Sequence, residues 1–70
     1  MISKYDFRDL VINENWIEVD SYMESMRKEE DRWDWYNEIV SDLELDDFND
    51  GEEYDLNEAI RNWIYNYIFD

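Results

Sequence analysis

Carboxylates are the side chains in this sequence whose types and spacing could do chemistry. Four of them, Glu30, Asp34, Glu38 and Asp42, recur at every fourth position. Four residues advance an α-helix by ~6 Å, so these carboxylates would form a row along one helical face. Such a row could supply acid and base groups, hold a cation, or recognise a basic partner.

Catalysis is the first of these functions to test. The chain of 70 residues has no histidine and no cysteine, which removes the commonest general base, the thiolate nucleophile and the usual zinc ligands. Paired carboxylates can hydrolyse glycosides, but a chain of this length has little scaffold for a sugar cleft. The sequence therefore predicts a protein that is not an enzyme and that uses no cofactor.

A calcium loop is the second function to test. Residues 46–57 resemble an EF-hand loop, with Asp46 at its first position and Gly51 at its sixth. The third position is Phe48, which offers no side-chain oxygen, and the twelfth is Asn57 instead of a bidentate glutamate. We therefore expect no specific metal site.

The charge distribution favours recognition of a basic protein. The chain has 21 acidic and 6 basic residues, a formal net charge of −15, and residues 29–58 hold fourteen of the acids with Arg32 as their only base. Solvated faces usually mix the two signs, and like charges four residues apart destabilise a helix by about 0.2–0.5 kcal/mol per pair. The same charge repels nucleic acid. The sequence predicts a basic protein partner and no direct nucleic-acid binding.

Composition predicts a folded, helical domain. Aromatic residues make up 19% of the chain, whereas disordered acidic chains are poor in them. We expect a single all-α domain over residues 1–70, a small bundle of three to four helices with an acidic outer face. A chain this short buries only about 60% of its unfolded surface, so a homodimer would add stability and remains open.

Capping residues predict where the helices begin. Ser3, followed by Asp6, and Asn15 are expected to start the first two helices, and Asp31 a third. No glycine or proline separates the second helix from the third, so the two could also be continuous.

Apolar spacing predicts which helical faces are buried. The expected stripes are Trp16, Val19, Met23 and Met26 in the second helix, and Trp33, Tyr36, Ile39, Val40 and Leu43 in the third. Trp35, Tyr65 and Phe69 lie off the stripes, and we expect them on the surface, where they could contact a partner.

The last helix has the clearest apolar period. It is expected to begin at Asp55, with Glu58 completing a capping box. Its expected buried residues are Leu56, Ala59, Ile60, Trp63, Ile64, Tyr67 and Ile68. Residues 44–54 before it are expected to form a loop that Phe48 holds to the core.

The sequence predicts no association with a membrane. No stretch approaches the ~18 apolar residues that a spanning helix needs, and the N-terminus has no signal-peptide pattern. We expect a cytoplasmic protein.

The acidic residues together could imitate a phosphate backbone. Duplex DNA carries one charge per ~1.7 Å of its axis, and its protein partners bind it largely through those charges. The predicted phosphate mimics are Glu30, Asp34, Glu38, Asp42, Asp46, Asp47, Asp50, Glu52, Glu53, Asp55 and Glu58. Two alternatives remain: a solvated surface without a partner, and an acidic interaction module that does not imitate DNA.

Three short fragments carry a resemblance to a known family. They are Trp35-Tyr36-Asn37-Glu38-Ile39-Val40, Asp46-Asp47-Phe48 and Asp55-Leu56-Asn57-Glu58-Ala59-Ile60. They resemble pieces of the Ocr-type antirestriction proteins, which are small, acidic, helical DNA mimics of phages. The resemblance implies a phage protein that occupies the DNA groove of a host defence enzyme, often as a dimer. It would make Asp46, Asp47, Asp55 and Glu58 phosphate mimics.

The chain departs from that family in two respects. It is shorter and lacks the family's long acidic C-terminal tail, and it ends in an aromatic run from Trp63 to Phe69. Neither the family's dimer interface nor its target can therefore be assigned to this chain. Anti-CRISPR proteins that mimic DNA have a similar composition, so a CRISPR effector is as compatible a target as a restriction enzyme.

Overall fold

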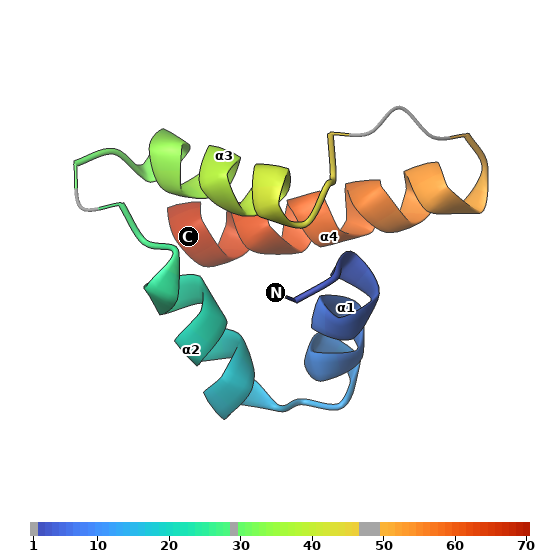
Figure 1. The fold of residues 1–70 in the computed structure, drawn as a ribbon, viewed down its shortest axis with the longest axis horizontal. Coiled ribbons are helices and arrows are strands. Elements are labelled where there is room, and N and C mark those ends of the chain that lie inside the picture. The colour runs from blue at the N-terminus through green and yellow to red at the C-terminus, as the bar shows by residue number, and fades with distance from the viewer. Residues whose placement is uncertain (1, 29, 47–49) are drawn as a thin grey trace.

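The computed structural model describes residues 2–28, 30–46 and 50–70. These residues form four α-helices and no strand, which confirms the predicted all-α fold. The helices are α1 (Lys4–Ile12), α2 (Trp16–Ser25), α3 (Arg32–Asp42) and α4 (Glu52–Phe69) (Figure 1). Because α2 ends at Ser25 and α3 begins at Arg32, the second and third helices are separate.

The longest helix, α4, is the element on which α1 and α3 pack. α3 runs antiparallel to α4 along one side, and α1 contacts α4 while also packing on α2 (Figure 1). The core between them consists of Phe7, Val19, Met23, Trp35, Ile39, Val40, Leu43, Leu45, Ile60, Ile64 and Ile68. Each large side chain buried there stabilises the fold by roughly 1.5–3 kcal/mol before entropy is subtracted.

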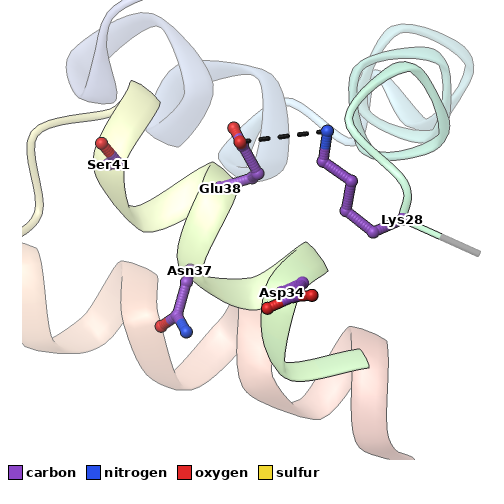
Figure 2. A pocket seen from close by; sticks show the side chains of 5 residues that line it. All are labelled: Lys28, Asp34, Asn37, Glu38 and Ser41. Carbon is purple, nitrogen blue, oxygen red and sulfur yellow. Dashed lines mark ion pairs between the residues drawn. The ribbon is translucent and has the colours of Figure 1, made fainter. Parts of the chain in front are cut away.

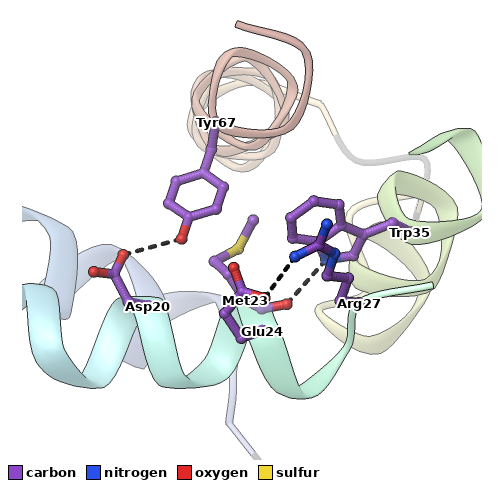
Figure 3. Close-up of polar contacts among 6 residues, drawn as sticks. All are labelled: Asp20, Met23, Glu24, Arg27, Trp35 and Tyr67. Carbon is purple, nitrogen blue, oxygen red and sulfur yellow. Dashed lines mark hydrogen bonds and ion pairs between the residues drawn. The ribbon is translucent and has the colours of Figure 1, made fainter. Parts of the chain in front are cut away.

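Polar contacts fasten α2 to α3 and α4 (Figure 3). The indole Nε1 of Trp35 donates to the carbonyl oxygen of Met23 at 2.9 Å, and the guanidinium of Arg27 lies over the same ring. The Tyr67 hydroxyl of α4 donates to Asp20 of α2 at 3.0 Å. These contacts place Trp35 in the core.

The buried face of α3 is therefore rotated from the predicted one. Trp35 is 7% exposed and Trp33 is 53% exposed, so both predictions were wrong. The predicted positions Ile39, Val40 and Leu43 are buried, which confirms that part of the stripe. The indole N–H of Trp35 has a buried acceptor, and such a partner makes burial of a tryptophan favourable.

The other stripes are confirmed in part. Val19 and Met23 of α2 are buried, but Trp16 is 45% exposed. In α4 the isoleucines at 60, 64 and 68 are buried, whereas Ala59 is exposed. Asn57 is buried, which the apolar pattern did not predict.

Two of the predicted caps are confirmed, and the start of α4 is not. The Ser3 hydroxyl accepts from the backbone N–H of Asp6 at 3.2 Å, and the Asp31 carboxylate accepts from Trp33 at 2.8 Å. Asn15 is the N-cap of α2 but makes no side-chain capping bond. α4 begins at Glu52, three residues before the predicted start.

The earlier start of α4 follows from Gly51. This residue has φ 69° and ψ −134°, a conformation that is open to glycine and strained for L side chains. Its carbonyl oxygen accepts from the backbone N–H of Asp55 at 3.1 Å, so Asp55 lies within the first turn of α4 and does not cap it. The predicted contact of Phe48 with the core lies outside the described residues.

α1 and α3 end in the same way, without a glycine. Glu14 and Glu44 have φ of 57° and 58°, in the left-handed region. The N–H groups of the residues that follow them bond back to Leu10 and Val40, each at 2.9 Å, and this pattern is the Schellman motif. The motif brings Leu45 into the core, within the segment that was predicted to be a loop.

Candidate acidic recognition surface

Most of the predicted phosphate mimics are exposed. Among the described residues of that set, the exposed ones are Glu30, Asp34, Glu38, Asp46, Asp50, Glu52, Asp55 and Glu58. Asp42 and Glu53 are half-buried, and Asp47 lies outside the described residues. The exposed carboxylates come from α3, from α4 and from the residues next to both helices.

The predicted row of four carboxylates is reduced to two on the outer face of α3. Asp34 and Glu38 border a shallow hollow together with Asn37 and Ser41 (Figure 2). Glu30 precedes the Asp31 cap, so it is not on the helix and the prediction of a four-membered helical row was wrong.

One cation reaches this hollow from the end of α2. The ammonium of Lys28 lies 3.9 Å from a Glu38 carboxylate oxygen (Figure 2). Both side chains are about half exposed, with 50% and 49% of their surface accessible, so the pair is worth at most about 1 kcal/mol. A positively charged partner can displace Lys28 from Glu38 at little energetic penalty.

Asp42 has a structural partner that the sequence did not predict. It accepts a hydrogen bond of 2.7 Å from the Tyr22 hydroxyl of α2. Burial, together with this bond and the negative charge of Asp42, raises the pKa of Tyr22 far above its usual range. The phenol is therefore neutral and remains a donor. Asp42 ties α2 to α3 and is not among the residues that line the Asp34–Glu38 hollow.

The start of α4 is a second acidic region. Glu52, Glu53 and Asp55 lie in its first turn, where negative charge interacts favourably with the helix dipole. Glu53 forms an ion pair of 3.1 Å with Lys4, whose side chain is 11% exposed. Glu52, Asp55 and Glu58 have no ion pair within the part of the chain that the structure describes.

A partly exposed aromatic cluster lies between the start of α3 and the end of α4, with Trp33 and Tyr65 exposed and Tyr36 and Phe69 half-buried. The ring of Phe69 lies 4.6 Å from that of Trp33 and 4.7 Å from that of Tyr65, and Tyr36 meets the same cluster. Exposure was predicted for Tyr65 and Phe69; Tyr65 is exposed, whereas Phe69 is half-buried against the core. Exposure of Trp33 was not predicted. Apolar periodicity alone could not have revealed this cluster, because it predicted that Trp33 would be buried.

The chemistry available to this surface is electrostatic. Within the described ranges, no three acidic side chains are grouped in a way that could hold a metal ion. The helices seen there are also too short or too polar to cross a lipid bilayer. The arrangement consists of fixed carboxylates at the surface and an aromatic cluster beside them.

Comparison with protein-family models, with curated proteins and with solved structures finds no match to this chain. The fragments that resemble Ocr-type proteins thus have no further support from these comparisons.

Proposed function

We propose that this protein is a DNA mimic that inhibits a host defence enzyme by occupying its nucleic-acid groove. The observation that carries the proposal is the exposure of carboxylates on two rigid helices, α3 and α4, and at their ends. A restriction enzyme or a CRISPR effector is the proposed class of target. The proposed site of action is the cytoplasm of the bacterial host.

The amount of charge matches the length of the molecule. Its longest dimension is 34 Å, and the same length of duplex DNA carries about 20 phosphate charges. The chain carries 21 acidic residues and a net charge of −15. A groove built for duplex DNA would therefore meet a body of comparable length and charge.

Local spacing supports the same proposal. Asp34 and Glu38 are separated by about 6 Å along α3, and Asp55 and Glu58 by roughly 4.5 Å along α4. These steps are of the same order as the ~3.4 Å of duplex axis that separates successive phosphates of one DNA strand. Ordered helices hold the carboxylates in place before binding, so little conformational entropy is lost on association.

Capture from a bacterial lysate tests the proposal. The immobilised protein is expected to retain a DNA-binding enzyme, which added duplex DNA releases. Retention should also fall as salt is raised, because charge pairing is screened. Partners that are indifferent to both duplex DNA and salt would contradict mimicry.

A charge-matched pair of variants sharpens this test. The first variant combines Asp34→Asn, Glu38→Gln, Asp55→Asn and Glu58→Gln. The second combines Asp9→Asn, Glu18→Gln, Glu24→Gln and Asp70→Asn, all at exposed positions outside the predicted set. Removal of four negative charges changes the net charge from −15 to −11 in both. Only the first should lose most of its affinity; equal losses would show that net charge alone determines binding.

The second candidate function is an interaction module that does not imitate DNA. The aromatic cluster of Trp33, Tyr36, Tyr65 and Phe69 favours it, because Trp33 and Tyr65 are exposed and aromatic side chains are enriched at protein interfaces. A homodimer through this cluster belongs to the same candidate. Under this function, Trp33→Ser would abolish binding, and the four-carboxylate variant would retain it.

A further inference from the structure

The surface between α1 and α4 has an apolar groove that DNA mimicry does not use. Phe7, Val11 and Ile12 line it from α1, and Leu56, Ile60 and Trp63 line it from α4. Its volume is about 290 Å³, at the lower limit of pockets that enclose small ligands. A groove of this size fits one or two apolar side chains of a protein partner.

Exposed apolar residues extend the groove at the end near Trp63. Ile12 is 61% exposed, and Trp16 stacks against Trp63 with ring centroids 6.3 Å apart and planes 4° from parallel. Trp16 is itself exposed and Trp63 is half-buried, so an occupant of the groove could also contact the stacked pair.

The opposite end of the groove is negatively charged. A second hollow continues from the first, because Arg8, Leu56 and Ala59 line both, and it contains Glu52 and Asp55. Glu53 is neutralised by Lys4. Glu52 and Asp55 outnumber the single positive charge of Arg8, so this end favours a basic group.

The length of the combined groove defines the shape of its occupant. Glu52 and Trp63 are eleven positions apart on α4, which corresponds to roughly 16 Å, or three helical turns. Helices that bind in such grooves insert apolar side chains spaced at i and i+4. A basic residue two turns from the apolar pair would reach Glu52 and Asp55.

We propose that the α1–α4 groove binds an amphipathic helix of a partner protein, with two apolar side chains near Trp63 and a lysine or arginine at Glu52 and Asp55. Its basic end shares Glu52 and Asp55 with the proposed phosphate mimics, whereas its apolar part is lined by residues outside that set. It would give the complex an apolar component that salt does not screen.

A displayed library of helical peptides tests this proposal with the intact protein. The peptides span about three turns and carry varied residues at an i, i+4 pair, with Lys, Gln or Glu two turns away. Selection should enrich large apolar pairs followed by Lys. A selection that yields no binder, or that enriches Glu at the charged position, would overturn the proposal.

Substitutions in the groove locate the binding site. Ala59→Trp fills the groove from an exposed position and should weaken a selected peptide at least about tenfold, as measured by fluorescence anisotropy. Asn62→Trp adds the same side chain to an exposed position of α4 outside the groove, and should change affinity less than about twofold. Equal effects of the two variants would overturn the proposal.

A second pair of substitutions tests the same groove in case Ala59→Trp does not fold. Ile12→Asp should abolish binding, and Ile17→Asp, at a residue 88% exposed and outside the groove, should not. Circular dichroism should show that each variant is helical before its binding is measured. Sedimentation tests self-association, and a dimer that Ala59→Trp dissociates would overturn the proposal by making a second copy the occupant.

Discussion

Two tyrosine–carboxylate hydrogen bonds explain why some acidic residues of this chain are structural. Tyr22 donates to Asp42 and Tyr67 donates to Asp20, and both bonds join α2 to another helix. Burial, followed by the hydrogen bond to Asp20, raises the pKa of Tyr67 to about 12. A neutral phenol is thus favoured in the folded protein, and these two carboxylates are not free for a partner.

Replacement of Tyr67 by phenylalanine should lower the free energy of unfolding by about 1–2 kcal/mol at pH 7, because a hydrogen bond to a charged group is lost. The neutral phenol contributes this stability below its unfolded pKa of about 10, and the contribution is lost as pH rises through about 12. Urea unfolding at several pH values should therefore show a shallower alkaline decline in Tyr67→Phe. Tyr65→Phe, at an exposed residue, serves as the control.

Asn57 is a buried polar residue whose replacement should stabilise the fold. It is 2% exposed, and neither polar atom of its side chain has a hydrogen-bond partner within the described residues. An unsatisfied buried amide costs about 1–3 kcal/mol. Asn57→Leu should raise the free energy of unfolding by a similar amount, whereas Asn62→Leu at an exposed site should change it little. A destabilised Asn57→Leu would show that Asn57 has a partner.

At the scale of the elements, the ends of α1 and α3 carry strain that glycine would remove. Glu14 and Glu44 adopt the left-handed conformation, which costs an L residue about 1–2 kcal/mol. Glu14→Gly and Glu44→Gly should each raise the free energy of unfolding by about 0.5–1 kcal/mol after the entropy of glycine is subtracted. Glu14→Ala removes the same charge without relieving the strain, and thermal unfolding should show no gain for it.

At Gly51 the opposite result is expected, because replacement of this glycine should destabilise the fold. No atom lies within 4 Å of a Cβ added there, so any effect of a substitution arises in the backbone. Gly51→Ala should lower the free energy of unfolding by about 1–3 kcal/mol. Chemical synthesis with D-alanine at this position should restore stability, because φ 69° and ψ −134° mirror a common extended conformation of L residues. Equal stability of the two alanine forms would contradict this account.

The start of a helix could be predicted from sequence where it depends on contacts between residues close together in the chain. Ser3 and Asp31 act through backbone N–H groups two or three residues away, so capping rules found them. The burial of Trp35 depends on the carbonyl oxygen of Met23 in α2, twelve residues away. The apolar periodicity of α3 contains no information on that contact. The start of α4 was placed too late because the capping pattern at Asp55 was preferred to the turn at Gly51.

The candidate site was predictable in composition and only partly in geometry. Charged side chains are rarely buried without a partner, so exposure of residues such as Asp34 and Asp55 followed from their type. The separation of Asp42 from the Asp34–Glu38 hollow depends on Tyr22, in another helix. The groove between α1 and α4 could not be foreseen, because it requires the relative placement of two helices distant in sequence.

At the scale of the whole molecule, the charge would dominate association. A net charge of −15 on a body 34 Å long would steer the protein toward a basic groove and accelerate encounter at low salt. The same charge repels itself within the fold, and the core and the tyrosine–carboxylate bonds must offset that repulsion. The proposed DNA mimicry would give so much charge of one sign a function.

The most direct measurement of the central proposal is a competition between this protein and duplex DNA for a captured enzyme. Labelled duplex is bound to the enzyme, the protein is titrated in, and fluorescence anisotropy reports the bound DNA. Mimicry predicts complete displacement of the duplex, with an affinity for the protein that falls steeply as salt is raised. A ternary complex, in which the enzyme holds the duplex and this protein together, would contradict the proposal.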